Sequence, residues 1–294
     1  MKDVSILIED TTGRYARPYA TAVADMMVAM VRGNGEAFRD ASERLNKVIR
    51  ETSGIAAVIG AGGVLRAAGA VIDSGQAFKE PAVQVILRKV TFAEAVDDLL
   101  KRTPVTIKDA AHRTAARLSQ IYGEGSKIAF ARSAEDAVTE RAQKFIASAF
   151  EQGAGENDAA TILARGVEEV REETAAWSES YARLSFRNNV NTAVSEARVQ
   201  QALDPDIAKV IPCMRFDSVG DGDTRDNHDA ADGMIFRPDN PDWQHMRPPI
   251  GHQCRCQWSL VSAPQLRRMG RVAEDGTIRE DRVPAGAHPD KGFK

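Results

Sequence analysis

The uneven distribution of proline is the feature that most constrains what this chain can fold into. Of its twelve prolines, only Pro18, Pro81 and Pro104 precede residue 205, and the other nine lie between Pro205 and Pro289. Because proline removes a backbone donor and interrupts helices, we expect long helices in the first two-thirds only. The predicted fold class is α+β, with a largely helical N-terminal two-thirds and a small C-terminal α+β domain.

Apolar periodicity and start signals predict helices throughout the N-terminal part. Residues 21–32 and 38–50 carry apolar side chains at helical spacing. Thr91 and Glu94 have the spacing of a capping box. A long helix is predicted over residues 172–203, because two apolar faces recur along it at i, i+4 and i+7: Trp177, Tyr181 and Leu184, then Val190, Val194 and Ala197.

Residues 54–72, GIAAVIGAGGVLRAAGAVI, form the most apolar window of the chain and include Arg66. A membrane-spanning helix needs about 20 apolar residues with few charges, so two interpretations stay open. One is a tightly packed helix of a soluble protein, and the other is a segment that touches a membrane under special conditions. We favour the packed helix and expect no stable membrane association. The acidic start MKDVSILIED also predicts no export signal.

Charge and cysteine content narrow the function classes. The formal net charge is −3 and the sequence pI is near 6.0, whereas nucleic-acid binders usually carry a basic surplus. Contact with DNA would therefore need a local basic patch. The three cysteines are an odd number, which argues against a secreted disulfide framework.

Changes in the frequency of proline, glycine and cysteine along the chain predict four parts. They are a helical region over residues 1–130, helices leading into the next domain over 131–204, a small α+β domain over 205–265, and a polar, loosely held tail over 266–294. Short β-branched and apolar runs predict the strands of the small domain: residues 209–216, 233–236 and 254–261.

The stretch PPIGHQCRCQW, residues 248–258, holds two of the three cysteines. In a strand, residues two apart point to one face, so Cys254 and Cys256 could bind one metal ion together. Zinc favours four nitrogen and sulfur ligands. The candidate metal ligands are therefore these two cysteines with His252, two residues before Cys254, and His228 from the acidic segment upstream.

Other interpretations of the same residues stay open. The thiols could pack as small buried apolar groups in a reduced protein, which is the simplest interpretation. A cysteine–histidine pair is also the raw material of a thiol nucleophile, as in a hydrolase or a nuclease-like toxin domain. A disulfide between Cys254 and Cys256 would close a very tight, strained ring.

The order of several short motifs over about residues 140–262 resembles the Mu F-like phage head morphogenesis (minor capsid) proteins. The motifs that carry the resemblance are Asp221, Thr224-Arg225, His228, Asp232-Gly233, Pro248-Pro249 and Cys254-Arg255-Cys256. Many members have a Cys-x-x-Cys pair where this chain has Arg225 and His228, and Asp223 stands where an arginine is common. The missing sulfur pair weakens the case for zinc, and residues 1–130 match no family that we can name.

The resemblance implies structural work in a virion rather than catalysis. It implies a minor head protein that is bound at the portal vertex, packaged in few copies, and located in the virion or, during assembly, in the host cytoplasm. The implied partners are the portal protein and other head components, with packaged DNA as a further one. A DNA-associated ejection protein and a Cys/His-dependent hydrolase or nuclease-like domain are the alternatives. No cofactor is implied beyond a structural zinc.

The motif residues outside the metal set are given a structural role: Asp221, Thr224, Arg225, Asp232, Gly233 and Arg255. We expect Arg225 and Arg255 to pair with the aspartates of residues 221–232, because that segment is strongly acidic. Contact of the two arginines with DNA phosphates is the alternative. Trp243 and Trp258 are expected to anchor the core of the small domain.

Overall fold

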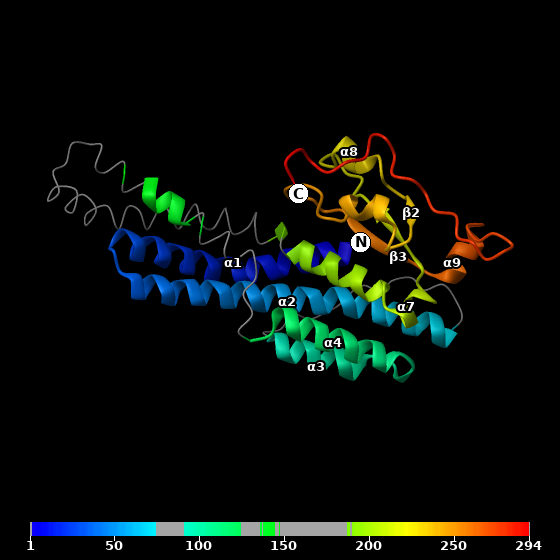
Figure 1. The fold of residues 1–294 in the computed structure, drawn as a ribbon, viewed down its shortest axis with the longest axis horizontal. Coiled ribbons are helices and arrows are strands. Elements are labelled where there is room, and N and C mark those ends of the chain that lie inside the picture. The colour runs from blue at the N-terminus through cyan, green and yellow to red at the C-terminus, as the bar shows by residue number, and fades with distance from the viewer. Residues whose placement is uncertain are drawn as a thin grey trace. The chain divides into compact units, whose positions relative to one another are not determined.

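Two long helices begin the chain in the computed structural model, which describes residues 2–74, 91–124, 136, 138–144, 147, 187–188 and 190–293. Helix α1 spans Lys2–Val31 and helix α2 spans Gly35–Ser74 (Figure 1). α1 covers the helix predicted at 21–32 as far as Val31, α2 contains the one predicted at 38–50, and Pro18 lies inside α1 without ending it. The predicted apolar face at Trp177, Tyr181 and Leu184 lies outside the described residues.

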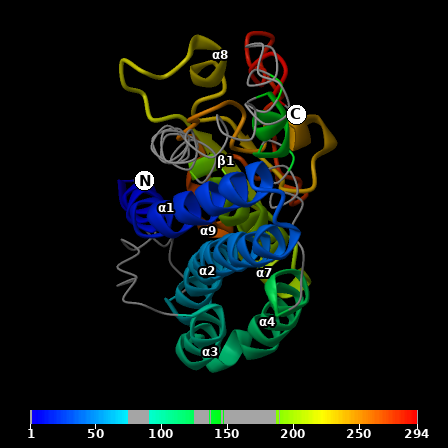
Figure 2. The same cartoon turned by 90° about the vertical axis from the view of Figure 1, so that its left-hand side faces the viewer.

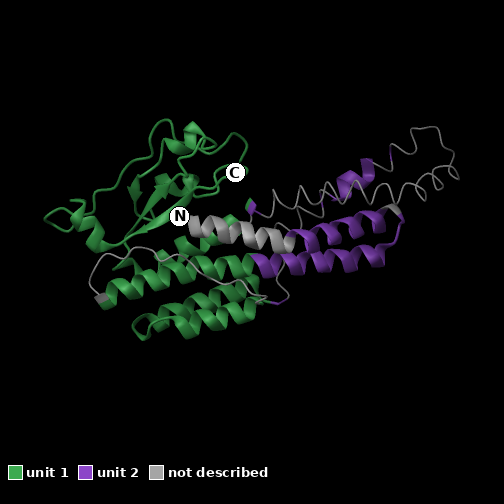
Figure 3. Cartoon of the chain, turned by 180° about the vertical axis from the view of Figure 1, so that it is seen from behind, with its two compact units in different colours: residues 1–9, 53–123, 188–294 green, residues 10–52, 124–187 purple. Residues whose placement is uncertain are grey.

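The chain divides into two compact units, each built from separate stretches of sequence (Figure 3). Unit 1 comprises residues 1–9, 53–123 and 188–294, and unit 2 comprises residues 10–52 and 124–187. Within unit 2, α1 and α2 are joined by an ion pair between Asp25 and Arg44, whose atoms lie 2.9 Å apart. The second half of α2 belongs to unit 1, which also holds the candidate site.

Three helical segments of unit 1 pack on the small residues of α2. They are α3 (Phe92–Arg102), α4 (Lys108–Tyr122), which follows the short helix η1 (Val105–Ile107), and the helical residues 190–202. Figure 2 shows α3 and α4 as neighbours. Thr91 and Glu94 form the predicted capping box of α3, which confirms that start signal. Val190, Val194 and Ala197 are buried, as their spacing predicted.

Glycine in α2 permits this close packing. A Cβ atom added at Gly60 would lie 2.4 Å from the carbonyl oxygen of Val194, and one added at Gly69 would lie 2.7 Å from the ring of Pro104. Both distances are shorter than a van der Waals contact, so a side chain at either position would push its neighbour away. The small-residue pattern of residues 54–72 therefore serves helix packing within unit 1.

Among the described helices, one is long and apolar enough to cross a membrane by length and composition. It is Gly35–Asp73, whose best window has a mean hydropathy of 1.9, and 83% of that window is buried in the fold. A core helix passes the same test. The burial of this window favours the packed-helix interpretation of residues 54–72.

Replacing Gly60 with alanine is expected to lower the free energy of unfolding by about 1–3 kcal/mol, because the new methyl group overpacks the contact with the Val194 backbone. Gly35→Ala in the same helix is the matched control, since its nearest neighbour would be the side chain of Arg39 at 3.9 Å. Urea unfolding followed by circular dichroism measures both. A Gly60→Ala protein as stable as the control would contradict this packing.

A three-stranded antiparallel sheet forms the centre of the C-terminal part, in the order β2-β1-β3. The strands are β1 (Cys213–Asp217), β2 (Ile235–Phe236) and β3 (Gln257–Val261). Short helices lie between and beside them: α7 (Pro205–Ala208) precedes β1, α8 (Asp226–Asp229) and η2 (Pro241–Met246) lie between the strands, and α9 (Ala263–Arg268) follows β3. The predicted α+β fold class is thereby confirmed. We call residues 205–293 the C-terminal module.

All three predicted strands begin later than expected, and β2 starts at Ile235 and not at residue 233. β1 starts at Cys213 and not at residue 209, because the N–H groups of Val210 and Ile211 bond back to the Ile207 carbonyl after α7. β3 starts at Gln257 and not at residue 254, because Gln253 has a φ of 58° and turns the chain before the strand. Cys254 and Cys256 therefore lie in a loop, and the prediction that they share a strand face was wrong.

Aromatic side chains fill the core of the module. Trp243 stacks on Phe236 with 4.0 Å between ring centroids, and Trp258 meets Phe236 edge-on at 4.7 Å. Trp243 and Trp258 are fully buried. Both tryptophans are therefore core anchors, as predicted.

The tail is fastened to the module, contrary to the expectation that it is loosely held. Asp281 accepts a hydrogen bond from the Ile235 N–H through its carboxylate at 2.9 Å, and from Trp243 Nε1 through its carbonyl at 3.0 Å. Glu280 accepts from the Arg237 N–H at 2.8 Å. The Ile235 and Arg237 N–H groups lie on and beside the edge strand β2, which needs such partners. We call residues 280–290 the C-terminal strap.

Candidate metal centre

His228, Cys254 and Cys256 meet inside the module. The Nδ1 atom of His228 lies 3.8 Å from the Cys254 sulfur and 3.6 Å from the Cys256 sulfur. The three ligand atoms all lie within 4.8 Å of one another, and all three residues are buried. The structure thus brings together three of the four residues that the sequence suggested as metal ligands.

His252 lies outside this group. It is exposed, its Nδ1 lies 3.4 Å from Asn188 Nδ2, and its ring meets that of Phe293 at 5.1 Å between centroids. Because Gln253 adopts a left-handed conformation, the chain turns between His252 and Cys254, and the His252 side chain points away from the cysteines.

The loop that carries the sulfurs is held by amide side chains. The Asn191 side chain donates to the Cys254 carbonyl at 3.0 Å, and Gln257 donates to the Asn191 side chain at 2.7 Å. The Cys254 N–H donates to the Gly251 carbonyl at 3.2 Å. A strand is therefore not needed to fix the two sulfurs, because buried hydrogen bonds fix the loop.

Asp290, from the C-terminal strap, orients the imidazole of His228. Its Oδ1 lies 3.1 Å from His228 Nε2. Because a carboxylate accepts hydrogen bonds, Nε2 carries the proton and Nδ1 faces the sulfurs. Asp290 also donates its N–H to the Ile250 carbonyl at 2.8 Å, and a Cβ at Gly251 would lie only 2.0 Å from its Oδ2. Sequence reasoning missed Asp290, since nothing local distinguishes it in a polar tail.

The buried cluster favours one thiolate. Hydrogen bonding from Cys256 and His228 holds the pKa of Cys254 below its ordinary value against the effect of burial, and the same coupling with burial raises the pKa of Cys256. Burial lowers the pKa of His228, but Cys254 and Asp290 outweigh it and leave that pKa above its ordinary value. The thiolate is the form of cysteine that binds metals.

The motif residues knit the loop around the cluster. Arg255 makes a bidentate pair with Asp221 at 2.6 and 2.7 Å, which confirms the predicted pairing for this arginine. Arg225 instead pairs with Asp290 at 3.4 Å and donates to the His252 carbonyl at 2.9 Å. The arginines thus tie the acidic loop to the cysteine loop and to the strap.

The three remaining motif residues shape the turns of the same loop. The Thr224 hydroxyl bonds to Asp221 at 3.1 Å, and the Asp232 carboxylate accepts the Ser218 N–H at 2.7 Å. Gly233 has a φ of 76°, which favours glycine.

Two chemistries fit the geometry better than catalysis does. Imidazole nitrogen and two cysteine sulfurs are the ligand types of zinc, and the same buried thiols also contribute to the apolar core with Trp258 and Ala287. A thiol nucleophile must reach a substrate, whereas Cys254 and Cys256 are each 3% exposed. The arrangement therefore favours a structural site.

The third cysteine provides a contrast. Cys213 is fully buried in β1, away from the cluster, and burial raises its pKa to about 12. Because the thiolate is the reactive form, we expect iodoacetamide at pH 8 to leave Cys213 unmodified in the folded protein and to modify it in urea. Peptide mass spectrometry measures the modification. Rapid labelling without urea would contradict the burial of β1.

Comparison with known proteins adds a family to this geometry. Residues 140–259 match the family model described as Phage Mu protein F like protein. The Mu-like prophage FluMu F protein of Haemophilus influenzae is 34% identical over 112 residues, which cover 37% of this chain and 27% of that protein. Putative capsid assembly protein F of Escherichia phage Mu is 33% identical over 112 residues, covering 37% of this chain and 26% of that protein.

The chain thus spans about a quarter of the length of these curated relatives. No solved structure matches it. His228, Cys254 and Cys256 all fall inside the matched residues, whereas Asp290 and all of unit 2's first stretch, residues 10–52, fall outside them.

Proposed function

We propose that the chain acts as a minor component in the assembly of a phage head, because residues 140–259 match the family model described as Phage Mu protein F like protein. The printed name of the phage Mu relative, a putative capsid assembly protein, supports this role. The observation that carries it is structural: the matched region contains a buried, internally bonded cluster built to hold a module together. The implied location is the virion, or the host cytoplasm during assembly.

The finer role that we propose is binding at the portal vertex in few copies. Unit 1 offers an apolar hollow for such a contact, a cavity of about 330 Å³ lined by α2, α4 and residues 196–205. Ile121 and Leu203 stand at it with 45% and 38% of their surfaces exposed. Arg113, at the same rim, pairs with Asp204 at 2.8 Å, which holds α4 against the start of the module.

A pull-down with the portal protein of the same phage tests this role. We expect the wild-type chain to retain the portal protein, and Ile121→Asp or Leu203→Asp to lose it while the fold is kept. Val105→Asp is the matched control, because Val105 is apolar, 88% exposed and not part of the hollow. Failure of the wild-type chain to bind would contradict the portal contact, and equal loss in all three variants would contradict its placement.

The proposed role is structural and requires no catalysis. A Cys254→Ala chain that still supports head assembly would agree with a role without a nucleophile, provided that the module folds. Packaged DNA is the alternative partner. Both arginines of the motif already have carboxylate partners, Asp221 for Arg255 and Asp290 for Arg225, which favours the structural role. DNA binding that weakens steeply with salt would support that alternative.

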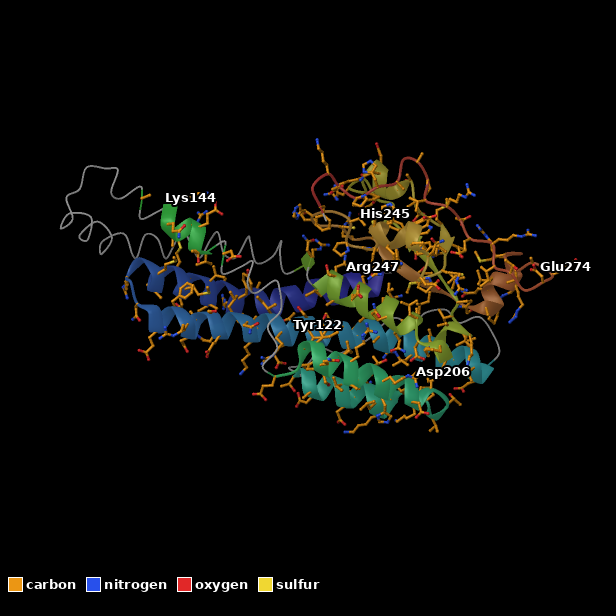
Figure 4. The ribbon with its side chains drawn as sticks, in the orientation of Figure 1. Tyr122, Lys144, Asp206, His245, Arg247 and Glu274 are labelled. Atoms are coloured by element: carbon orange, nitrogen blue, oxygen red, sulfur yellow. The ribbon has the colours of Figure 1, made fainter. Side chains whose placement is uncertain are left out.

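Polar contacts tie the C-terminal module to the helical residues 190–202 that precede it in unit 1. Arg247 of the module, labelled in Figure 4, pairs with Glu196 on helical residues 190–202. Asn191 of the same helical residues holds the cysteine loop. We infer that the helix which precedes the module and the module itself act as one body in assembly.

A further inference from the structure

We propose that His228, Cys254 and Cys256 bind one structural Zn²⁺, and that Asp290 acts as a positioning residue that holds the imidazole from outside the metal's ligand set. This inference concerns the fold of the C-terminal module, so it stands or falls separately from the role in head assembly. It replaces the four-ligand set suggested by the sequence with three described ligands and one supporting carboxylate.

The spacing of the ligand atoms fits a tetrahedral ion. With zinc–sulfur bonds of about 2.3 Å and zinc–nitrogen bonds of about 2.0–2.1 Å, a tetrahedral site sets sulfur and nitrogen ligands about 3.5–3.6 Å apart. The observed separations from Nδ1 are 3.6 Å to the Cys256 sulfur and 3.8 Å to the Cys254 sulfur. The two nitrogen–sulfur distances therefore match those of a zinc site, and all three ligand atoms lie within 4.8 Å of one another. A fourth ligand would have to come from outside these three residues, because structural zinc is almost always four-coordinate.

Thiolate and imidazole ligands select the kind of metal. Two cysteine sulfurs with one histidine nitrogen suit zinc, while calcium and magnesium require oxygen ligands. A thiol–imidazole hydrogen bond spans a similar distance, so the ligand spacing alone also fits a metal-free cluster. Metal content separates the two cases.

The outer carboxylate is the feature that thiol packing does not require. Metal-binding histidines commonly donate their second N–H to a carboxylate, which fixes the ring and makes the ligand nitrogen more basic. Here His228 Nε2 meets Asp290 Oδ1 at 3.1 Å. Asp290 is itself held by Asn227 at 3.3 Å and by its own N–H on Ile250. Its carboxylate is thus fixed on the side of the ring opposite the sulfurs.

The same contacts link the ion to the C-terminal strap. The metal would join α8 to the cysteine loop, and Asp290 would join both to residues 280–290. Binding free energy would then appear as folding free energy of the module.

Zinc content of the purified full-length chain tests the proposal. The chain is prepared under reducing conditions, equilibrated with zinc sulfate, freed of unbound metal and analysed by plasma mass spectrometry. We expect one equivalent in the wild type, one equivalent in Cys213→Ala, and loss of zinc in Cys256→Ala. Cys213→Ala is the matched control, since it also removes a buried thiol but lies outside the cluster. A wild-type content below about half an equivalent, or an unchanged content in Cys256→Ala, would overturn the site.

Two further readouts keep the test decisive if Cys256→Ala fails to fold. Cobalt(II) bound to the wild type should give the visible spectrum of a tetrahedral cobalt–thiolate site, and its absence would count against the ligand set. Asp290→Asn should lower zinc affinity by roughly 10–100-fold in a chelator competition while the metal-free protein keeps its melting temperature. Equal loss of stability with and without metal, at unchanged zinc affinity, would make Asp290 a fastening of the strap only.

Discussion

Replacing Trp243 with alanine is expected to lower the free energy of unfolding of the C-terminal module by about 3–5 kcal/mol. Trp243 is fully buried, stacks on Phe236 at 4.0 Å, and donates its indole N–H to the Asp281 carbonyl at 3.0 Å. The alanine would leave a large cavity between η2 and β2, and it would also release the strap from the indole. Both losses act on the same side of the sheet.

The measurement for Trp243→Ala must report on the module and not on the long helices. Alkylation of the buried Cys213 during a urea titration does so, because Cys213 lies in β1. Trp243→Phe is the control. It keeps most of the apolar volume but loses the hydrogen bond, so we expect a loss of about 1–3 kcal/mol. A Trp243→Ala midpoint equal to that of the wild type would show that this core does not hold the module.

Ending the chain after Arg279 is expected to unfold the module, because the strap then no longer satisfies buried groups. The Ile235 N–H and the Trp243 indole N–H would lose their acceptors on Asp281, and His228 would lose Asp290. Each buried donor left without a partner costs about 1–3 kcal/mol, and the three losses add to the exposure of core surface. The expected total exceeds about 5 kcal/mol, a large part of the stability of a small domain.

The matched control for this truncation ends the chain after Lys291. It removes three residues and keeps the contacts of Glu280, Asp281 and Asp290. We expect the control to label at Cys213 only in urea and the shorter chain to label without it. Equal protection of Cys213 in both chains would mean that the strap is the loose tail that its composition first suggested.

Local signals in the sequence were enough for the helices and for the core anchors. Thr91 and Glu94 cap α3 because their hydrogen bonds span a single turn. Val194 is buried because helical spacing alone places it on an apolar face. The small residues of α2 had two explanations in sequence, and the close approaches of Val194 to Gly60 and of Pro104 to Gly69 show that they serve helix packing.

The candidate site was predictable in its residue types but not in its geometry. His228, Cys254 and Cys256 could be predicted as metal ligands because cysteine and histidine are rare in this chain, and their side chains bind metals in any fold. The prediction that the two cysteines share a strand face was wrong, because Gln253 adopts a φ of 58° and turns the chain before the strand. A positive φ is usually found at glycine or asparagine, so a glutamine at this position gave no sign of the turn. The sulfurs converge on His228 nonetheless, because Asn191, far away in sequence, fixes the loop.

Asp290 and the strap show why a polar tail is hard to interpret. A carboxylate among prolines and glycines is typical of a solvated end, and its partner His228 lies 62 positions earlier. Such a pairing depends on where the sheet carries both segments. The same holds for Arg225, which pairs with Asp290 and not with its acidic neighbours.

The most direct test of the central claim is the protein composition of phage heads purified on a density gradient from lysed host cells. If this chain is a head component, it should sediment with the major capsid protein and remain there after a high-salt wash, at a low and constant ratio. Its recovery only in the soluble fraction, with none in procapsids or in finished heads, would contradict the account.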